Sequence, residues 1–198
     1  MTDTKVLIEN AAMKAVSIYG LRGVRVKHIG KLSGLTNSSI YTYFSGEQEL
    51  MTECFEKVDH QVAALFDNID PEELDFKGDP EGTTYKLWLP YFEWFIAHPD
   101  ETIFYKMYRE DPGYPAYNAK RDVSHFSSFM RIINEFEKAY PDSVKYAKSN
   151  ILWIHFLNGT LTYARYVIDG TLPYTEKTEK EAFEFLMNGI SCFFKSEE

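Results

Sequence analysis

The apolar residues of this chain recur at intervals of three and four along most of its length, and Gly and Pro residues interrupt the pattern repeatedly. Such spacing places apolar side chains on one face of an α-helix. No strand-like alternation is sustained between turn residues, so we predict an all-α protein of about nine helices. Residues 6–19 show the helical stripe most clearly, before Gly20, with Ile8, Ala11, Ala12, Ala15, Ile18 and Tyr19.

The first 46 residues contain signals for three short helices. The second is predicted to begin at Val26 and to end in a turn, where Gly34 permits a sharp reversal of the chain. The third is predicted to begin at Thr36, whose hydroxyl can accept hydrogen bonds from exposed N–H groups of the next turn. A long helix follows Ser45-Gly46, so we expect a small domain of residues 1–46 and a larger one of residues 47–198.

Gly, Pro and acidic clusters divide the larger domain into long helices and loops. Residues 67–82 are rich in Asp, Glu, Pro and Gly, a composition typical of a surface loop. Residues 111–117 are also expected as a loop, because two prolines and a glycine interrupt a helix. The predicted helices span about residues 47–66, 83–97, 99–109, 118–139, 142–168 and 176–194.

Charge is distributed unevenly between the two expected domains. The chain has a net charge of −9, but residues 1–46 carry +4 and the remainder −13. We call residues 1–46 the head and residues 47–198 the body. A basic head and an acidic body suit a DNA-binding protein in which only one end approaches the duplex, although an uneven distribution of charge can also arise by chance. The two cysteines have no zinc or disulfide spacing, and no apolar run is long enough for a membrane span. We expect a cytoplasmic protein.

The third short helix separates an apolar face from a polar one. Residues four apart lie on one face of a helix, so Ile40 and Phe44 point together into a small core. The opposite face carries Asn37, Ser38, Tyr41 and Thr42. Amide and hydroxyl groups at a helix start can meet base edges or phosphates in the major groove. The alternative is a three-helix cap whose polar face is only solvated.

The N-terminal segment resembles the signature of TetR-family regulators over about residues 6–51, without gaps. The matching residues are Ile8, Ala11-Ala12, Ala15-Val16, Gly20, Val26, Ile29, Gly34-Leu35-Thr36, Ile40-Tyr41-Thr42-Tyr43-Phe44 and Glu49-Leu50. The resemblance implies an N-terminal helix-turn-helix DNA-binding domain and a C-terminal helical bundle for effector binding and dimerisation. It also implies a homodimer joined through its last two helices, with recognition helices in successive major grooves of a palindromic operator.

The resemblance also assigns roles to residues of the head. Thr36 and Tyr41 are expected to contact phosphates, and Asn37, Ser38 and Thr42 to lie nearest the bases. Ser39 is a weaker candidate. Arg25 and Lys27, at the start of the second helix, are expected to hold the adjacent DNA backbone without reading sequence.

Three departures from the family pattern bear on this expectation. Val24 stands where a Thr cap is usual, and Gly30 stands where the family has a small residue such as alanine. Ser45 and Glu47 replace residues that are often basic. A glutamate beside phosphate is repulsive, so we expect weaker or more salt-sensitive operator binding, and Glu47→Lys is expected to strengthen it.

Aromatic residues at helical spacing are candidates for an effector-binding cavity, although such stripes are more often plain core. Polar neighbours such as His125, His155, Asn158 and Arg165 could orient a ligand, but no metal-binding spacing is present. The candidate effector-binding residues are Trp88, Tyr91, Phe92, Phe104, Tyr108, Phe126, Phe129, Trp153 and Phe156.

The functional prediction is a ligand-responsive transcriptional regulator, a repressor that binds operator DNA as a homodimer and is released by a small apolar or aromatic effector. We predict no cofactor and no enzymatic activity, because the sequence has no phosphate-binding glycine loop and no nucleophile elbow. The alternative is a helical small-molecule or protein-binding dimer without DNA-binding activity, which Glu47 and the acidic body would allow.

Overall fold

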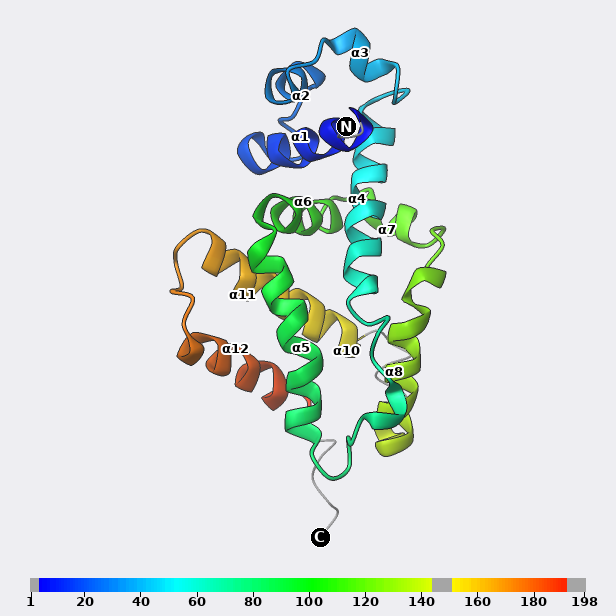
Figure 1. Cartoon of the computed structure of the whole chain (residues 1–198), viewed down its shortest axis with the longest axis vertical. Helices are drawn as coiled ribbons and strands as arrows, with labels where there is room; N and C mark the ends of the chain where they lie inside the picture. The colour runs from blue at the N-terminus through cyan, green and yellow to red at the C-terminus, as the bar shows by residue number, and fades with distance from the viewer. Residues whose placement is uncertain (1–3, 144–150, 192–198) are drawn as a thin grey trace. The chain divides into compact units, whose positions relative to one another are not determined.

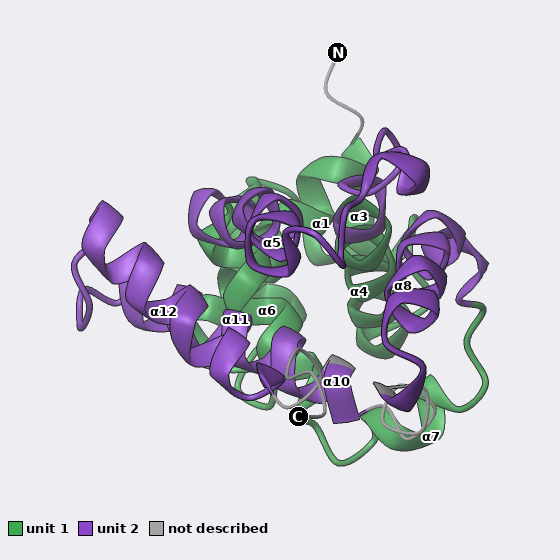
Figure 2. Ribbon diagram, turned by 90° about the horizontal axis from the view of Figure 1, so that it is seen from below, with its two compact units in different colours: residues 1–61, 98–122 green, residues 62–97, 123–198 purple. Residues whose placement is uncertain are grey.

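The computed structural model describes residues 4–143 and 151–191, and all regular secondary structure in these ranges is helical (Figure 1). The predicted all-α fold is confirmed. The chain forms two compact units, coloured separately in Figure 2. Unit 1 comprises residues 1–61 and 98–122, and unit 2 comprises residues 62–97 and 123–198. This division follows the packing of the helices, so the first three helices share a unit with residues 98–122. The functional boundary near residue 46 stays a prediction.

Unit 1 contains the three short N-terminal helices and the elements packed around them. The helices are α1 (Thr4–Tyr19), α2 (Val26–Ser33), α3 (Asn37–Tyr41), most of α4 (Glu47–Ala64), α6 (Pro99–Arg109) and α7 (Tyr114–Asn118). Helix α1 packs against both α2 and α6. Four residues of its predicted apolar stripe are buried, Ile8, Ala11, Ala12 and Ala15, but the prediction is wrong for Ile18 and Tyr19, which are exposed. The side chains that fill this part of the core are Ile8, Ala12, Ala15, Val16, Ile29, Ile40, Phe44, Leu50 and Phe55.

The expectation of a loop at residues 111–117 is wrong for its second half, which begins helix α7. Pro115 lies in the first turn of α7, where its missing N–H would have no partner inside the helix. The chain turns into α7 through Asp111, whose carboxylate Oδ1 accepts the Gly113 N–H at 2.8 Å. Pro112 and Gly113 therefore precede α7 and Pro115 lies in its first turn, so none of the three interrupts the helix.

Unit 2 contains the remaining helices. They are η1 (Pro71–Glu73), α5 (Pro80–Ala97), η2 (Ser124–Phe126), α8 (Ser127–Ala139), η3 (Pro141–Ser143), α10 (Ile151–Trp153), the π-helical turn η4 (Ile154–Asn158), α11 (Gly159–Ile168) and α12 (Glu176–Asn188). Helix α5 packs against α11 and α12. Near η1, the side chains of Phe66, Phe76, Ile132 and Phe136 form a buried apolar cluster.

Several predicted boundaries in unit 2 and its connections are wrong. The helix expected over 118–139 begins only at Ser127, because the backbone of Val123 (φ −120°, ψ 14°) leaves the helical region before η2. Helix α5 begins at Pro80, three residues before the predicted start. Helix α4 ends at Ala64 and α12 at Asn188. The first part of the helix expected over 142–168 lies partly outside the described residues, as does the expected end at 194.

Candidate DNA-binding surface

Helix α3 is capped as the sequence predicts. The Thr36 hydroxyl accepts the Ser39 N–H at 3.2 Å and shares hydrogen bonds with the hydroxyls of Ser38 and Ser39 at 2.9 and 2.8 Å. The Thr42 hydroxyl donates to the Ser38 carbonyl at 3.1 Å. A five-residue helix has few internal hydrogen bonds, so these side-chain contacts stabilise its conformation.

The polar face of α3 points into solvent. Asn37, Ser38, Tyr41 and Thr42 are exposed, and Tyr41 retains 52% of its accessible surface, whereas Ile40 is buried on the opposite face. The orientation predicted for these side chains is therefore observed. That these side chains contact DNA stays a prediction. The same holds for the contacts with phosphates or bases expected of Thr36, Ser39, Arg25 and Lys27.

Two glycines set how closely α2 and α3 approach. Gly34 ends α2 with φ +73°, a left-handed conformation that glycine adopts without steric cost. At Gly30, a Cβ atom would lie 2.7 Å from the Leu35 carbonyl oxygen and 3.2 Å from Asn37 Oδ1. Glycine is a poor helix former compared with alanine, but at position 30 the absence of a side chain leaves space for the start of α3.

The two cationic residues at the start of α2 are exposed. The Arg25 guanidinium folds back and donates from Nη1 to the carbonyl oxygens of Arg22 at 2.9 Å and Val24 at 2.6 Å. A guanidinium has five N–H donors, so further donors of Arg25 can serve an anion while it holds this turn. Lys27 lies two residues further along the chain and is also exposed, whereas Val26 between them is buried.

Glu47, expected to face phosphate, makes a hydrogen bond within the protein. Its Oε1 atom accepts the backbone N–H of Val26, the first residue of α2, at 3.0 Å. The charge of Glu47 alone does not predict this contact. The sequence does contain one indication of it: Arg25, the residue before α2, has a side chain with donors and no acceptor, so the first N–H of α2 needs an acceptor from another residue.

An aromatic cluster around Phe55 of α4 was also missed by sequence reasoning. The Phe55 ring stacks on Tyr105 and Tyr108 of α6, with centroids 5.0 and 4.8 Å apart. The edges of Tyr114 and Tyr117 of α7 meet the same ring at 5.5 and 5.7 Å. We call these five residues the Phe55 cluster; it fastens α6 and α7 to α4 within unit 1.

A buried carboxylate lies beside this cluster. Asp59 is 1% exposed, accepts a hydrogen bond from the Tyr105 hydroxyl at 2.6 Å and forms an ion pair with Arg121. The Arg121 guanidinium also lies 5.5 Å from the centroid of the Phe55 ring. Burial, together with a hydrogen bond to the Glu56 carboxylate, raises the pKa of Tyr117.

The candidate effector-binding residues belong to separate clusters. Phe104 and Tyr108 lie in unit 1, and the others belong to unit 2. Trp88 stacks on Phe92 at 4.6 Å and donates its indole N–H to Thr160 at 3.0 Å. Tyr91 and Phe129 pack against the buried cluster that contains Phe66. The ring of Phe126 contacts His125, and Phe156 is half-buried next to His155. The side chain of Trp153 lies outside the described residues.

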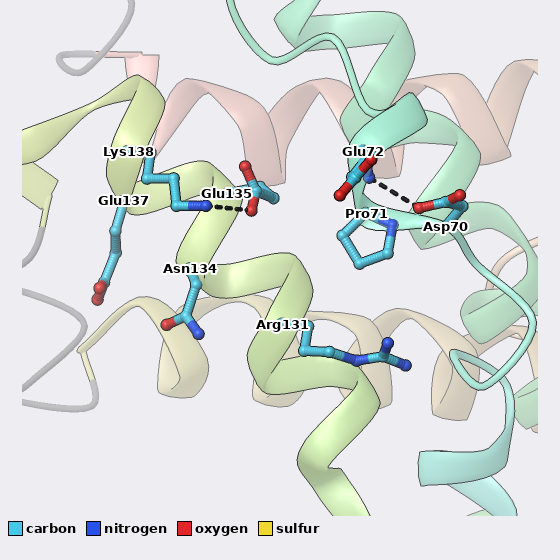
Figure 3. A pocket seen from close by; sticks show the side chains of 8 residues that line it. All are labelled: Asp70, Pro71, Glu72, Arg131, Asn134, Glu135, Glu137 and Lys138. Atoms are coloured by element: carbon cyan, nitrogen blue, oxygen red, sulfur yellow. Dashed lines mark hydrogen bonds and ion pairs between the residues drawn. The ribbon is translucent and has the colours of Figure 1, made fainter.

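Two surface hollows are lined by other residues. Figure 3 shows a hollow of about 580 Å³ in unit 2 between η1 and α8, lined by Asp70, Pro71, Glu72, Arg131, Asn134, Glu135, Glu137 and Lys138. Its charged lining differs from the apolar cavity that the sequence predicts. The second, of about 450 Å³ in unit 1, lies between residues 19–23 and residues 107–112. Neither hollow contains a candidate effector-binding residue.

Within residues 4–143 and 151–191, no group of three or more His, Cys, Asp or Glu side chains is arranged to hold a metal ion. In the same ranges, none of the helices combines the length and the apolar character that crossing a bilayer requires. Cys54 is a free thiol whose pKa is raised by burial. Cys192 lies outside the described residues.

No family model matches the chain, and no curated protein matches it in sequence. Solved structures do match over nearly the whole chain. A TetR-family transcription regulator from Marinobacter aquaeolei VT8 is 15% identical with a TM-score of 0.69, covering 93% of this chain and 94% of its own. A putative TetR-family regulator from Shewanella sp. PV-4 is 15% identical with a TM-score of 0.65, covering 94% and 97%.

A TetR-family regulator from Haemophilus influenzae RD matches in the same way, at 14% identity and a TM-score of 0.63, covering 94% of this chain and 96% of its own. All three alignments include both the short N-terminal helices and the longer helices that follow, since each leaves only a few per cent of the chain unmatched. The resemblance predicted from residues 6–51 is thereby extended to the remaining three-quarters of the chain. This chain has the fold of the TetR-family transcription regulators.

Proposed function

We propose that the protein is a cytoplasmic, ligand-responsive transcriptional regulator, a repressor that binds a palindromic operator as a homodimer. The observation that carries this proposal is the capped helix α3, whose polar face of Asn37, Ser38, Tyr41 and Thr42 is exposed in a chain with this fold. The operator is bound by two copies of α3, one from each subunit.

Each part of the head has a distinct task in this proposal. The amide of Asn37 and the hydroxyls of Ser38 and Thr42 meet base edges in the major groove, where amide groups pair well with adenine. Tyr41 and Thr36 contact the phosphates beside the groove. Arg25 and Lys27 hold the neighbouring backbone and set the register of the head on the duplex.

Dimerisation is assigned to α10–α12 in this proposal. The sequence pattern assigns an apolar face of the last two helices either to this interface or to the interior of one subunit, with Ile151, Ile154, Leu157, Leu161, Ala164, Phe183, Leu186, Met187, Ile190 and Phe194. Six of these residues are buried inside a single subunit: Leu161, Ala164, Phe183, Leu186, Met187 and Ile190. Phe194 lies outside the described residues. Large apolar side chains on the same elements remain exposed: Ile151, Ile154, Tyr166 and Phe185, the last with 69% of its surface accessible. Large apolar side chains left exposed on the elements assigned to dimerisation support an interaction surface there. These four residues are the proposed contact with the second subunit.

Close packing within the subunit supports the exposure of this face. A Cβ atom at Gly159 would lie 2.5 Å from Leu186 Cδ2, and one at Gly189 would lie 2.3 Å from His155 Nε2. His155 Nε2 also lies 2.7 Å from the carbonyl oxygen of Leu186. The close approach at Gly159 accommodates the buried side chain of Leu186, whereas Phe185, the residue before it, is exposed.

The effector in this proposal is a small apolar or aromatic molecule bound in the larger domain, which shifts the population of subunits away from the DNA-binding arrangement. The aromatic density of unit 2 supports this, since Trp88, Phe92 and Phe183 form one packed group there. A ligand could enter by replacing ring–ring contacts with ring–ligand contacts of similar chemistry.

A mobility-shift assay tests the proposal with duplexes taken from the region upstream of the protein's own operon, at two salt concentrations. The expected result is saturable binding to one palindrome that weakens steeply with salt, because phosphate contacts release counterions. Binding to no duplex at either salt concentration would favour the alternative, a helical dimer without DNA-binding activity. Analytical ultracentrifugation in parallel should give a dimer that Phe185→Asp converts to monomer, whereas the exposed change Glu184→Gln beside it should leave a dimer.

A further inference from the structure

Helix α2 begins at a residue that cannot cap it. Arg25 occupies the capping position, with an extended backbone (φ −142°, ψ 153°), but its side chain carries only hydrogen-bond donors. The first N–H groups of a helix lack partners within the helix and need an acceptor from elsewhere. In most helices a Ser, Thr, Asp or Asn at this position supplies that acceptor.

Two other side chains supply acceptors in its place. The His28 Nδ1 atom accepts the Arg25 N–H at 3.2 Å, and Glu47 Oε1 accepts the Val26 N–H at 3.0 Å. Val26 is 5% exposed, so its N–H would lose a good partner if the carboxylate were absent. Glu47 is the first residue of α4, and this hydrogen bond therefore ties the start of α2 to the start of α4.

The position of Glu47 changes what its charge does. A carboxylate at a helix N-terminus interacts favourably with the positive end of the helix dipole, and here it faces the N-terminus of α2 while it begins α4. Its negative charge is therefore directed at backbone N–H groups of the protein. The partial positive charge at the start of α2 offsets part of the repulsion between Glu47 and phosphate that the sequence predicts, and salt screens the rest.

We propose that Glu47 is a positioning residue for DNA binding, which replaces the missing cap of α2 and fixes Arg25 and Lys27 where they can meet the DNA backbone. The proposal rests on the proposed function for its DNA part. It connects two departures from the family pattern, Val24 and Glu47. Neither Val24 nor Arg25, the next residue and the one at the capping position, has a side chain that can accept the first N–H of α2, and Glu47 at the start of α4 accepts it instead. It also reverses the expectation for Glu47→Lys, which now removes an acceptor and weakens binding.

Amide hydrogen exchange followed by NMR on the full chain without DNA tests the cap directly. Glu47→Ala and Glu47→Lys should raise the exchange rate of the Val26 amide roughly tenfold, the size expected for loss of a cap. Glu47→Gln keeps an acceptor oxygen and should restore protection to within about twofold. Gln48→Ala, the matched change at an exposed neighbour, should leave the Val26 amide unchanged. Unchanged exchange in Glu47→Ala would overturn the proposal.

DNA affinity and its salt dependence test the positioning role, with a duplex enriched by the unmodified protein from a random-sequence pool. Glu47→Ala should bind that duplex several-fold more weakly and with a smaller salt slope, because Arg25 and Lys27 neutralise fewer phosphates. Glu47→Gln should restore both, a rescue that loss of general stability would not give. Tighter binding by folded Glu47→Ala and Glu47→Lys would overturn the proposal. If the unmodified protein enriches no duplex, the proposed function fails, while Val26 exchange still decides whether Glu47 caps α2.

Discussion

Unit 1 contains two regions that are held together in different ways. The region of α2 and α3 depends on a few local interactions: a hydroxyl cap from Thr36, a carboxylate cap from Glu47 and the absence of a side chain at Gly30. The Phe55 cluster depends on ring contacts and on the buried pair of Asp59 and Arg121. Changes in the region of α2 and α3 should alter the exposed polar face of α3 at a modest cost in stability. Changes in the Phe55 cluster should unfold unit 1.

The largest effect is expected from Phe55→Ala. Phe55 is fully buried and contacts four tyrosine rings, so its removal should lower the free energy of unfolding by about 3–5 kcal/mol, the range for large-to-small core changes. Urea denaturation followed by circular dichroism measures this. Phe55→Leu keeps most of the apolar volume and should cost less. Equal stability of Phe55→Ala and the unmodified protein would show that the cluster does not hold unit 1 together.

Asp59→Asn should have the next largest effect, because it removes the buried carboxylate that pairs with the half-buried Arg121. Breaking one side of a buried ion pair costs about 3–5 kcal/mol when the remaining charge stays buried, and less where Arg121 reaches water. We therefore expect a loss near about 3 kcal/mol. A double-mutant cycle with Arg121→Met should give a total well below the sum of the two single changes. Additive losses would mean that the two side chains do not depend on each other.

Gly30→Ala should cost less, although alanine is the better helix former. The new Cβ atom would lie 2.7 Å from the Leu35 carbonyl oxygen, so the start of α3 must shift. Overpacking of this kind costs about 1–3 kcal/mol, more than the gain in helix propensity of about 1 kcal/mol. Thermal unfolding measures the change, and Gly46→Ala, where no atom lies within 4 Å of the new Cβ, is the matched control. A higher melting temperature for Gly30→Ala alone would contradict this account of the close approach.

The interactions of the α2–α3 region differ in how far the sequence predicts them. The turn at Gly34, the cap at Thr36 and the outward face of Asn37 and Ser38 follow from local chemistry within a few residues, and these predictions agree with the structure. The hydrogen bond from Val26 to Glu47 joins residues far apart in sequence. Local patterns do not contain that information.

The Phe55 cluster was hidden for a related reason. Pro112, Gly113 and Pro115 indicate a loop when each is considered alone, but Pro115 occupies the first turn of α7, where proline is well tolerated. Tyr108 was assigned to an effector cavity because aromatic spacing on one helix does not identify the partner ring. Likewise, periodicity identified the apolar face of α12 that carries Leu186 but could not decide whether that face is buried within one subunit or against a second, and it did not indicate that Phe185 is exposed.

The smallest effect on stability, and the largest on specificity, is expected from Asn37→Ala. The side chain is exposed, so the free energy of unfolding should change by less than about 0.5 kcal/mol. If Asn37 meets a base edge, discrimination at one base pair of each half-site should fall by about 1–3 kcal/mol. Ser127→Ala, outside the head, is the control and should change neither quantity.

The most direct test of the DNA-reading face is therefore a comparison of the sequences that the unmodified protein and Asn37→Ala enrich from one random duplex pool. We expect a palindrome from the unmodified protein and the same palindrome with relaxed preference at one position per half-site from the variant. Identical preferences from both proteins, or enrichment of no sequence by either, would contradict the assignment of the exposed face of α3 to DNA.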